Sequence, residues 1–169
     1  MPESTNKLVT RSEWLAYMEV GGDSAKTYKL IGEGFTSFAE SKNPKEYSRQ
    51  YVNEKSERTD VVGYAPSIDY SCDVYSTDPV IQELITIADK ELIGSDTHRK
   101  ICSVNTWVAG TTEGTYAAFE RTYAVVPSTK GDGTDALIYA GTLRAVGDIV
   151  PGEFDPETCT FTAESEISA

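Results

Sequence analysis

The sequence has very little of what catalytic and metal sites are usually built from. Among 169 residues there is one histidine, His98, and there are three cysteines. The signatures GxSxG, HExxH and GxxxxGKS/T do not occur. A catalytic triad would have to use His98, and a triad requires convergence in space rather than the sequence adjacency of His98 with Ser95 and Asp96. We therefore expect a chain that is not an enzyme and has no catalytic residue, cofactor or bound metal.

The cysteines and the apolar runs exclude further classes. Cys72, Cys102 and Cys159 are odd in number and far apart, and each lies in a strand-like run, which predicts free, reduced and half-buried thiols. No apolar run approaches the roughly 18 residues that a membrane span requires, and no signal-like segment follows Met1. We expect a protein that contacts no membrane and remains in the cytoplasm where it is made.

Positive charge is scarce in the second part of the chain. The formal net charge is -12; residues 1–60 carry ten acids and nine bases, whereas residues 61–169 carry seventeen acids and six bases. Such a surface repels phosphate, so tight binding of nucleic acid is not expected. The segment from Lys42 to Arg58 holds five bases with Tyr47 and Tyr51, but three glutamates interrupt it, and it does not indicate sequence readout.

Residues that favour strands are abundant, with 19 Thr, 13 Val, 10 Ile and 10 Tyr against 7 Leu. This bias predicts a mainly β protein. The clearest strand is at residues 67–75, where one row of side chains alternates with another: Ile68, Tyr70, Cys72 and Val74 against Asp69, Ser71, Asp73 and Tyr75. The alternation predicts one apolar face and one wet, acidic face.

A helix at about residues 78–92 follows this strand. Asp78 is a good N-cap, and Pro79 suits the first helical position because its missing N–H is not needed there. The apolar stripe is expected to consist of Ile81, Leu84, Ile85 and Ala88. Gly94 is expected to provide the left-handed cap that ends the helix.

The whole chain is expected to divide into an N-terminal segment, one domain and a C-terminal tail. Residues 1–12 are predicted to be an N-terminal arm, residues 13–163 one β domain, and residues 164–169 an acidic C-terminal tail. A hairpin is expected from residues 14–20 and 26–31, and later strands at residues 99–107, 115–126, 136–146 and 158–162, with a turn at 154–157. Residues 40–63 are polar and cannot bury a face alone, so they form either a mobile surface loop or a long hairpin that orders against another subunit.

The order of these elements resembles that of the major tail tube proteins of long-tailed bacteriophages, in the group found in phages and prophages of Gram-positive bacteria. The resemblance covers roughly residues 14–162 and depends on a series of segments rather than on one motif. They are Trp14 to Gly22, GEGFTS at 32–37, SKNPKEY at 41–47, YVNE at 51–54, VGYAPSI at 62–68, the acidic strand with the Asp78-Pro79 helix, IGSD at 93–96, GDIVPGEFD at 147–155 and Thr160-Phe161.

The resemblance implies an antiparallel β-sandwich or barrel with one flanking helix that assembles into rings, usually of six subunits, which stack into a hollow tail tube. It implies a virion protein made and assembled in the host cytoplasm, through whose lumen the phage genome is ejected without specific binding. The partners it implies are other copies of the chain, the tape measure protein, the tail terminator and the distal tail or baseplate proteins.

Two groups of residues become candidate sites under this resemblance. The acidic row Asp69, Ser71 and Asp73 is predicted to line the lumen, where like charge keeps DNA from adhering. A subunit interface is predicted at Asn43, Pro44, Tyr47, Arg49 and Tyr51, because aromatic side chains lie isolated in a polar segment. Two alternatives stay open: the inner tube of a contractile tail or phage-tail-like particle, and a monomeric β-sandwich that binds carbohydrate or protein.

Overall fold

In the computed structural model, residues 6–21 and 26–167 are described, and they are mainly β. The strands are β1 (Trp14–Val20), β2 (Thr27–Ile31), β3 (Phe35–Ser41), β4 (Pro44–Arg49), β5 (Arg58–Tyr64), β6 (Ser67–Asp73), β7 (His98–Ala109), β8 (Tyr116–Lys130), β9 (Ile138–Ala145), β10 (Val150–Asp155) and β11 (Thr160–Ala163). The helices are α1 (Pro79–Asp89) and α2 (Glu164–Ile167), with 3₁₀ turns η1 (Arg11–Glu13) and η2 (Gly94–Thr97).

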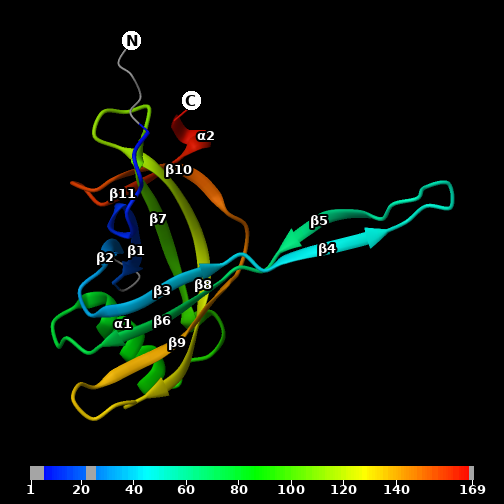
Figure 1. The fold of residues 1–169 in the computed structure, drawn as a ribbon. Helices are drawn as coiled ribbons and strands as arrows, with labels where there is room; N and C mark the ends of the chain where they lie inside the picture. Colours follow the sequence, from blue (N-terminus) through cyan, green and yellow to red (C-terminus); the bar gives the residue numbers. More distant parts are fainter. Residues whose placement is uncertain (1–5, 22–25, 168–169) are drawn as a thin grey trace.

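Nine of these strands form one antiparallel sheet that curls into a half-barrel (Figure 1). Its order is β2-β1-β7-β8-β9-β6-β3. The long strand β8 pairs with β9 along its second half and with β10 along its first half, and β11 extends the sheet beyond β10. The predicted mainly β, antiparallel fold with a flanking helix is confirmed.

The sheet buries apolar side chains on both of its faces. On one face α1 packs against β1, β6, β7, β8 and β9, in a cluster that includes Met18, Ile68 and Leu143. On the other face a smaller cluster gathers around Phe154 of β10, with Tyr17 and Val104. Strands β1, β7 and β8 contribute to both clusters and so connect the two cores of the fold.

The helix α1 begins as its sequence predicts and ends differently. The Asp78 carboxylate accepts hydrogen bonds from the backbone N–H groups of Val80 and Ile81. The left-handed residue that caps the helix is Glu91 (φ 51°), and the Leu92 N–H bonds to the Ile87 carbonyl in a Schellman arrangement. Gly94 is also left-handed (φ 63°), but it lies beyond this cap and begins η2. The buried stripe is Val80, Ile81, Leu84 and Ile87. Ile85 and Ala88, which the periodicity placed in it, are only half-buried.

Several other sequence predictions need correction. Phe154, expected in a turn, lies in β10 and is fully buried, and the strand β3 was not predicted. Cys72 and Cys102 are fully buried rather than half-buried, and burial raises the pKa of Cys72 to about 11. Cys159 lies in a turn with φ 53° rather than in a strand. The segment predicted to be an acidic tail begins with the short helix α2.

The polar segment forms a hairpin that projects from the body (Figure 1). Strands β4 and β5 pair only with each other in a two-stranded sheet, within the part of the chain that the structure describes. Only two residues separate β3 from β4, and only two separate β5 from β6. We call residues 44–64 the arm. The hairpin of the second sequence interpretation is therefore present, and its ordering against another subunit stays a prediction.

Candidate assembly surfaces

The arm brings three of the five predicted interface residues together. The Arg49 guanidinium lies 4.9 Å from the ring centre of Tyr47 and 5.4 Å from that of Tyr51. Its Nε also donates to the Tyr51 hydroxyl at 2.6 Å. Arg58, which the sequence analysis did not select, lies 5.8 Å from the Tyr51 ring. We call these four residues the Arg–Tyr stack, and such cation–π contacts order exposed side chains that would otherwise move freely.

The other two predicted residues lie at the root of the arm. Asn43 has φ 45°, a conformation that asparagine tolerates. Its amide donates to the Ala65 carbonyl and to the Ser67 hydroxyl, each at 3.1 Å. Pro44 starts β4 opposite Tyr64. Asn43 and Pro44 therefore lie where the arm leaves the body, and their place in a subunit interface stays a prediction.

The arm also exposes apolar side chains beyond Tyr51, the last residue of the predicted interface. The exposed side chains are Tyr47, Tyr51, Val52, Val61, Val62 and Tyr64. Val52, at the tip, is as exposed as in an extended chain, at 109%. Apolar side chains exposed on a projecting hairpin are available for contact with another protein surface. The Val61-Val62 pair in the sequence was the signal that could have identified them.

The acidic row lies on the side of β6 that faces away from α1. Asp69 is exposed, and Ser71 and Asp73 are half-buried, while Ile68 and Tyr70 between them point into the core. The Thr142 hydroxyl of β9 donates to the Asp69 carboxylate at 3.0 Å. The row lies one strand in from the β3 edge of the sheet, since β3 and β9 pair with β6 on either side.

Two of the open strand edges among the described residues lie at opposite ends of the order β8-β9-β6-β3. Among the described residues, β3 pairs with β6 alone, and β8 pairs with nothing on the β7 side beyond Ala124. Arg11 covers one carbonyl of the first edge: its guanidinium donates to the Phe38 carbonyl at 3.1 Å and stacks 4.8 Å from the Trp14 ring. Open edges present backbone N–H and C=O groups that can pair with a strand of another chain. The sequence could not reveal them, since an edge is defined by the absence of a neighbour.

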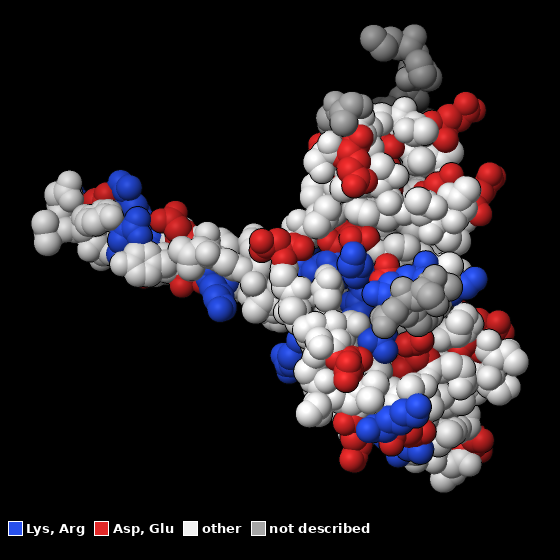
Figure 2. Space-filling model, turned by 180° about the vertical axis from the view of Figure 1, so that it is seen from behind, with Lys and Arg blue, Asp and Glu red and all other residues white. Residues whose placement is uncertain are grey.

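The charges are unevenly distributed over the surface. Figure 2 shows Lys and Arg gathered across the middle of the body and along the arm. At the end of the body that carries β10, β11 and α2 in Figure 1, the same view shows acidic atoms and no basic ones. The sequence agrees, since residues 146–169 contain six acids and no Lys or Arg.

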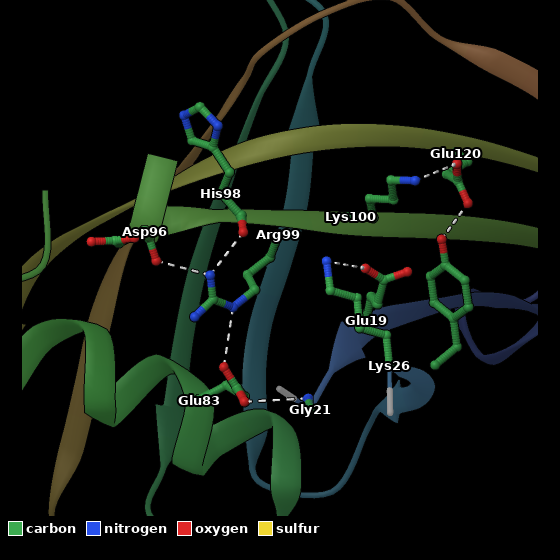
Figure 3. A network of polar contacts seen from close by, with 10 residues as sticks. Glu19, Gly21, Lys26, Glu83, Asp96, His98, Arg99, Lys100 and Glu120 are labelled. Atoms are coloured by element: carbon green, nitrogen blue, oxygen red, sulfur yellow. Dashed lines mark hydrogen bonds and ion pairs between the residues drawn. The ribbon is translucent and has the colours of Figure 1, made fainter. Parts of the chain in front are cut away.

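The single histidine lies beside a polar network that braces α1 (Figure 3). Arg99 donates to Glu83 of α1 at 3.1 Å and to the backbone carbonyls of Asp96 and His98 at 2.9 and 2.8 Å. The Glu83 carboxylate also accepts from the Gly21 N–H at 3.4 Å. In Figure 3 the His98 imidazole points away from these groups, so His98 joins the network through its carbonyl. These contacts indicate that the network stabilises the position of α1. That the chain is not an enzyme stays a prediction.

A surface hollow of about 460 Å³ lies beside this network. Its lining includes Lys26, His98 and Arg99. Residues 6–21 and 26–167 contain no group of three or more His, Cys, Asp or Glu side chains arranged to hold a metal ion. In the same part of the chain, no helix has the length and apolar character needed to cross a membrane.

Glu153 of β10 clamps the loop between β7 and β8. Its carboxylate accepts hydrogen bonds from the Thr111 N–H, from the Thr111 hydroxyl at 2.7 Å and from the Thr115 hydroxyl at 3.1 Å. Gly110 is required here, because a Cβ at this position would lie 2.8 Å from the Glu153 carboxyl carbon. The hydrogen bonds, those of Thr111 first, lower the pKa of Glu153 to about 2.

This clamp predicts a pH dependence of stability. A carboxylate with a lowered pKa stabilises the fold above its unfolded value of 4.5, and the stabilisation is lost as the pH falls through about 2. We expect the Glu153→Gln variant to have a lower urea midpoint than the wild type at pH 7, and the difference to shrink between pH 5 and pH 2. Glu157→Gln, at an exposed position of the same end, is the control. A difference that does not depend on pH would contradict the assignment.

No protein-family model matches the chain, and no curated protein matches its sequence. Solved structures that are similar to it include two components of phage-like particles. A chain from the tail of an empty GTA particle with C6 symmetry is 11% identical, with a TM-score of 0.57 over 92% of this chain and 100% of that one. A chain from the six-fold symmetrised baseplate of the anti-feeding prophage is 10% identical, with a TM-score of 0.49 over 88% and 96%. The first likeness establishes the fold of the chain.

Proposed function

We propose that this chain is a structural virion protein that assembles into stacked six-membered rings, forming the hollow tail tube through which phage DNA is ejected. The proposal is supported by the fold, which is that of a chain in a C6-symmetric tail. It is carried by one observation of this chain, the two open strand edges at opposite ends of β8-β9-β6-β3.

These edges allow a ring to form while the strands of each subunit keep their own pairing. Strands alternate in direction across an antiparallel sheet, so β3 of one copy runs antiparallel to β8 of the next. Pairing the β3 edge with the free part of β8, residues 125–130, joins different surfaces of two copies, and such a contact closes into a ring when the rotation fits. Each ring would then present four strands per copy as one continuous sheet. Arg11 must release the Phe38 carbonyl for this pairing.

The face of these strands that α1 does not cover becomes the lumen in this proposal. It carries Asp69, Ser71 and Asp73, so the tube wall repels the DNA backbone. The helix α1 packs on the opposite face and lies outside the sheet of the ring. The tape measure protein, the terminator and the distal tail proteins remain the partners proposed for the ends of the tube.

Electron microscopy of the purified chain across a concentration series, with sedimentation velocity beside it, tests this function. Rings or hollow tubes are the expected result. A strict monomer at every concentration, including in the presence of tail-initiating proteins, would rule the tube out and favour the monomeric binding module.

The lumen assignment makes a separate prediction. The double variant Asp69→Asn, Asp73→Asn should fold and assemble normally, because asparagine at position 69 still accepts the Thr142 hydrogen bond. DNA release should slow several-fold, since each subunit loses two repelling charges; dye fluorescence of released DNA measures the rate. Asp132→Asn with Glu157→Gln removes the same charge at two other exposed positions and should leave the rate unchanged. If the Asp69, Asp73 variant cannot fold or assemble, the assignment is wrong.

A further inference from the structure

A groove at the acidic end of the body has the chemistry to receive the arm. It has a volume of about 340 Å³ and lies between β8, β10 and α2. Its lining is mostly apolar and includes Ala117, Phe119, Pro151, Gly152 and Ile167. Phe119, near the start of β8, is 37% exposed, which is a large exposure for a phenylalanine in a central strand.

The charge around the groove complements the arm. Residues 146–169, which form β10, β11 and α2, carry six acids and no base. The arm carries four basic and four acidic residues, and its Arg–Tyr stack places Arg49 and Arg58 beside exposed aromatic rings. The chain as a whole has a net charge of -12, whereas the arm is neutral. The apolar side chains of the arm complement the apolar lining of the groove, and its guanidinium groups complement the acidic border.

The groove belongs to a different part of the body from the root of the arm. The arm leaves from the ends of β3 and β6 and points away from the body, whereas β10 and α2 lie at another end of it (Figure 1). An arm extended in this direction cannot fold back into the groove of its own chain. The occupant must therefore be the arm of a second copy.

We propose that the arm of one copy binds in this groove, which we call the Phe119 groove, of another copy. The tip around Val52 lies against the apolar lining, and the guanidinium groups of the Arg–Tyr stack face α2. This contact deepens the proposed tube function, on which it rests, by naming the surface that receives the arm. Arm and groove are different surfaces, so the contact is head-to-tail and propagates along an assembly. It is separate from the strand edges and can therefore be tested on its own.

Disulfide trapping between two differently labelled full-length chains tests the contact. One chain carries Val52→Cys and the other Ser165→Cys in α2, both in a Cys159→Ser background; Cys72 and Cys102 are buried. Docking brings the two thiols together at a high effective concentration, so we expect about tenfold more mixed dimer than with Thr134→Cys, an exposed control in the β8–β9 turn. Equal yields with Ser165→Cys and Thr134→Cys would overturn the proposal.

A groove variant provides the second measurement. Phe119→Glu in the Ser165→Cys chain should remove the excess of mixed dimer, whereas Phe119→Leu should retain it, with circular dichroism to confirm that both variants fold. Trapping that persists in a folded Phe119→Glu chain would also overturn the proposal. Wild-type tubes without specific trapping refute the groove alone, and a wild-type chain that never assembles refutes the tube function instead.

Discussion

Shortening the arm is expected to abolish long-range assembly while leaving the body folded. In the variant, residues 46–62 are replaced by Asn-Gly, which joins Lys45 and Gly63, a cross-strand pair, by a two-residue turn of the kind that hairpins favour. The deletion removes the Arg–Tyr stack and the exposed apolar side chains of the arm, but no residue of the three core clusters. Electron microscopy and sedimentation velocity should show monomers or single rings in place of tubes.

The control for this variant keeps the arm and changes only its contact chemistry. Replacing Tyr47 and Tyr51 with serine leaves the hairpin pairing in place and should reproduce most of the loss. Normal long tubes from the shortened chain would contradict a role for the arm in assembly. Thermal unfolding should show a body as stable as that of the wild-type monomer, because the arm pairs only with itself among the described residues.

Phe154→Ala is expected to be the most destabilising single substitution of a core residue. The Phe154 side chain is fully buried, and its ring centre lies 4.3 Å from that of Tyr17 and 5.8 Å from that of Tyr28. Replacing a buried phenylalanine with alanine costs about 3 to 5 kcal/mol, since transfer free energy is lost and a cavity remains. For a chain of this length the melting temperature should fall by roughly 6 to 20 °C.

This measurement is best made on the arm-shortened chain, because assembly would otherwise stabilise the fold by mass action and hide part of the effect. Phe154→Leu should cost less, about 1.5 kcal/mol or below. Phe161→Ala is the matched control, since Phe161 packs against the same cluster but is only partly buried. Equal losses for Phe154→Ala and Phe161→Ala would contradict the expectation that Phe154 contributes most to this cluster.

Local chemistry explains where the sequence analysis succeeded. The start of α1 is encoded by two adjacent residues, Asp78 and Pro79, and the cap forms between groups no more than three positions apart. The two faces of β6 follow from strict alternation. The end of α1 was predicted wrongly, because a glutamate, Glu91, adopts the left-handed capping conformation that sequence reasoning assigns to glycine.

The candidate sites were predictable only in part. The acidic row was visible as an alternating pattern, and Tyr47, Arg49 and Tyr51 as aromatic and basic residues in a polar segment. Arg58 completes their stack from the opposite strand, and its contact with Tyr51 depends on the register of the hairpin, which pairs Arg49 with Arg58. The Phe119 groove was not predictable, because its lining comes from β8, β10 and α2.

By itself, the sequence determined the mainly β composition, the helix after the acidic strand, the excess of negative charge and the polar character of the arm, since each depends on residue type or on neighbours within one turn or strand. Only the tertiary structure decided which strands pair, which edges stay open and that Phe154 belongs to the core. Those features depend on segments such as β3, β6 and β9 meeting across many residues of intervening chain. Pairing of this kind is selected by the burial of the whole sheet, a property that no single segment carries.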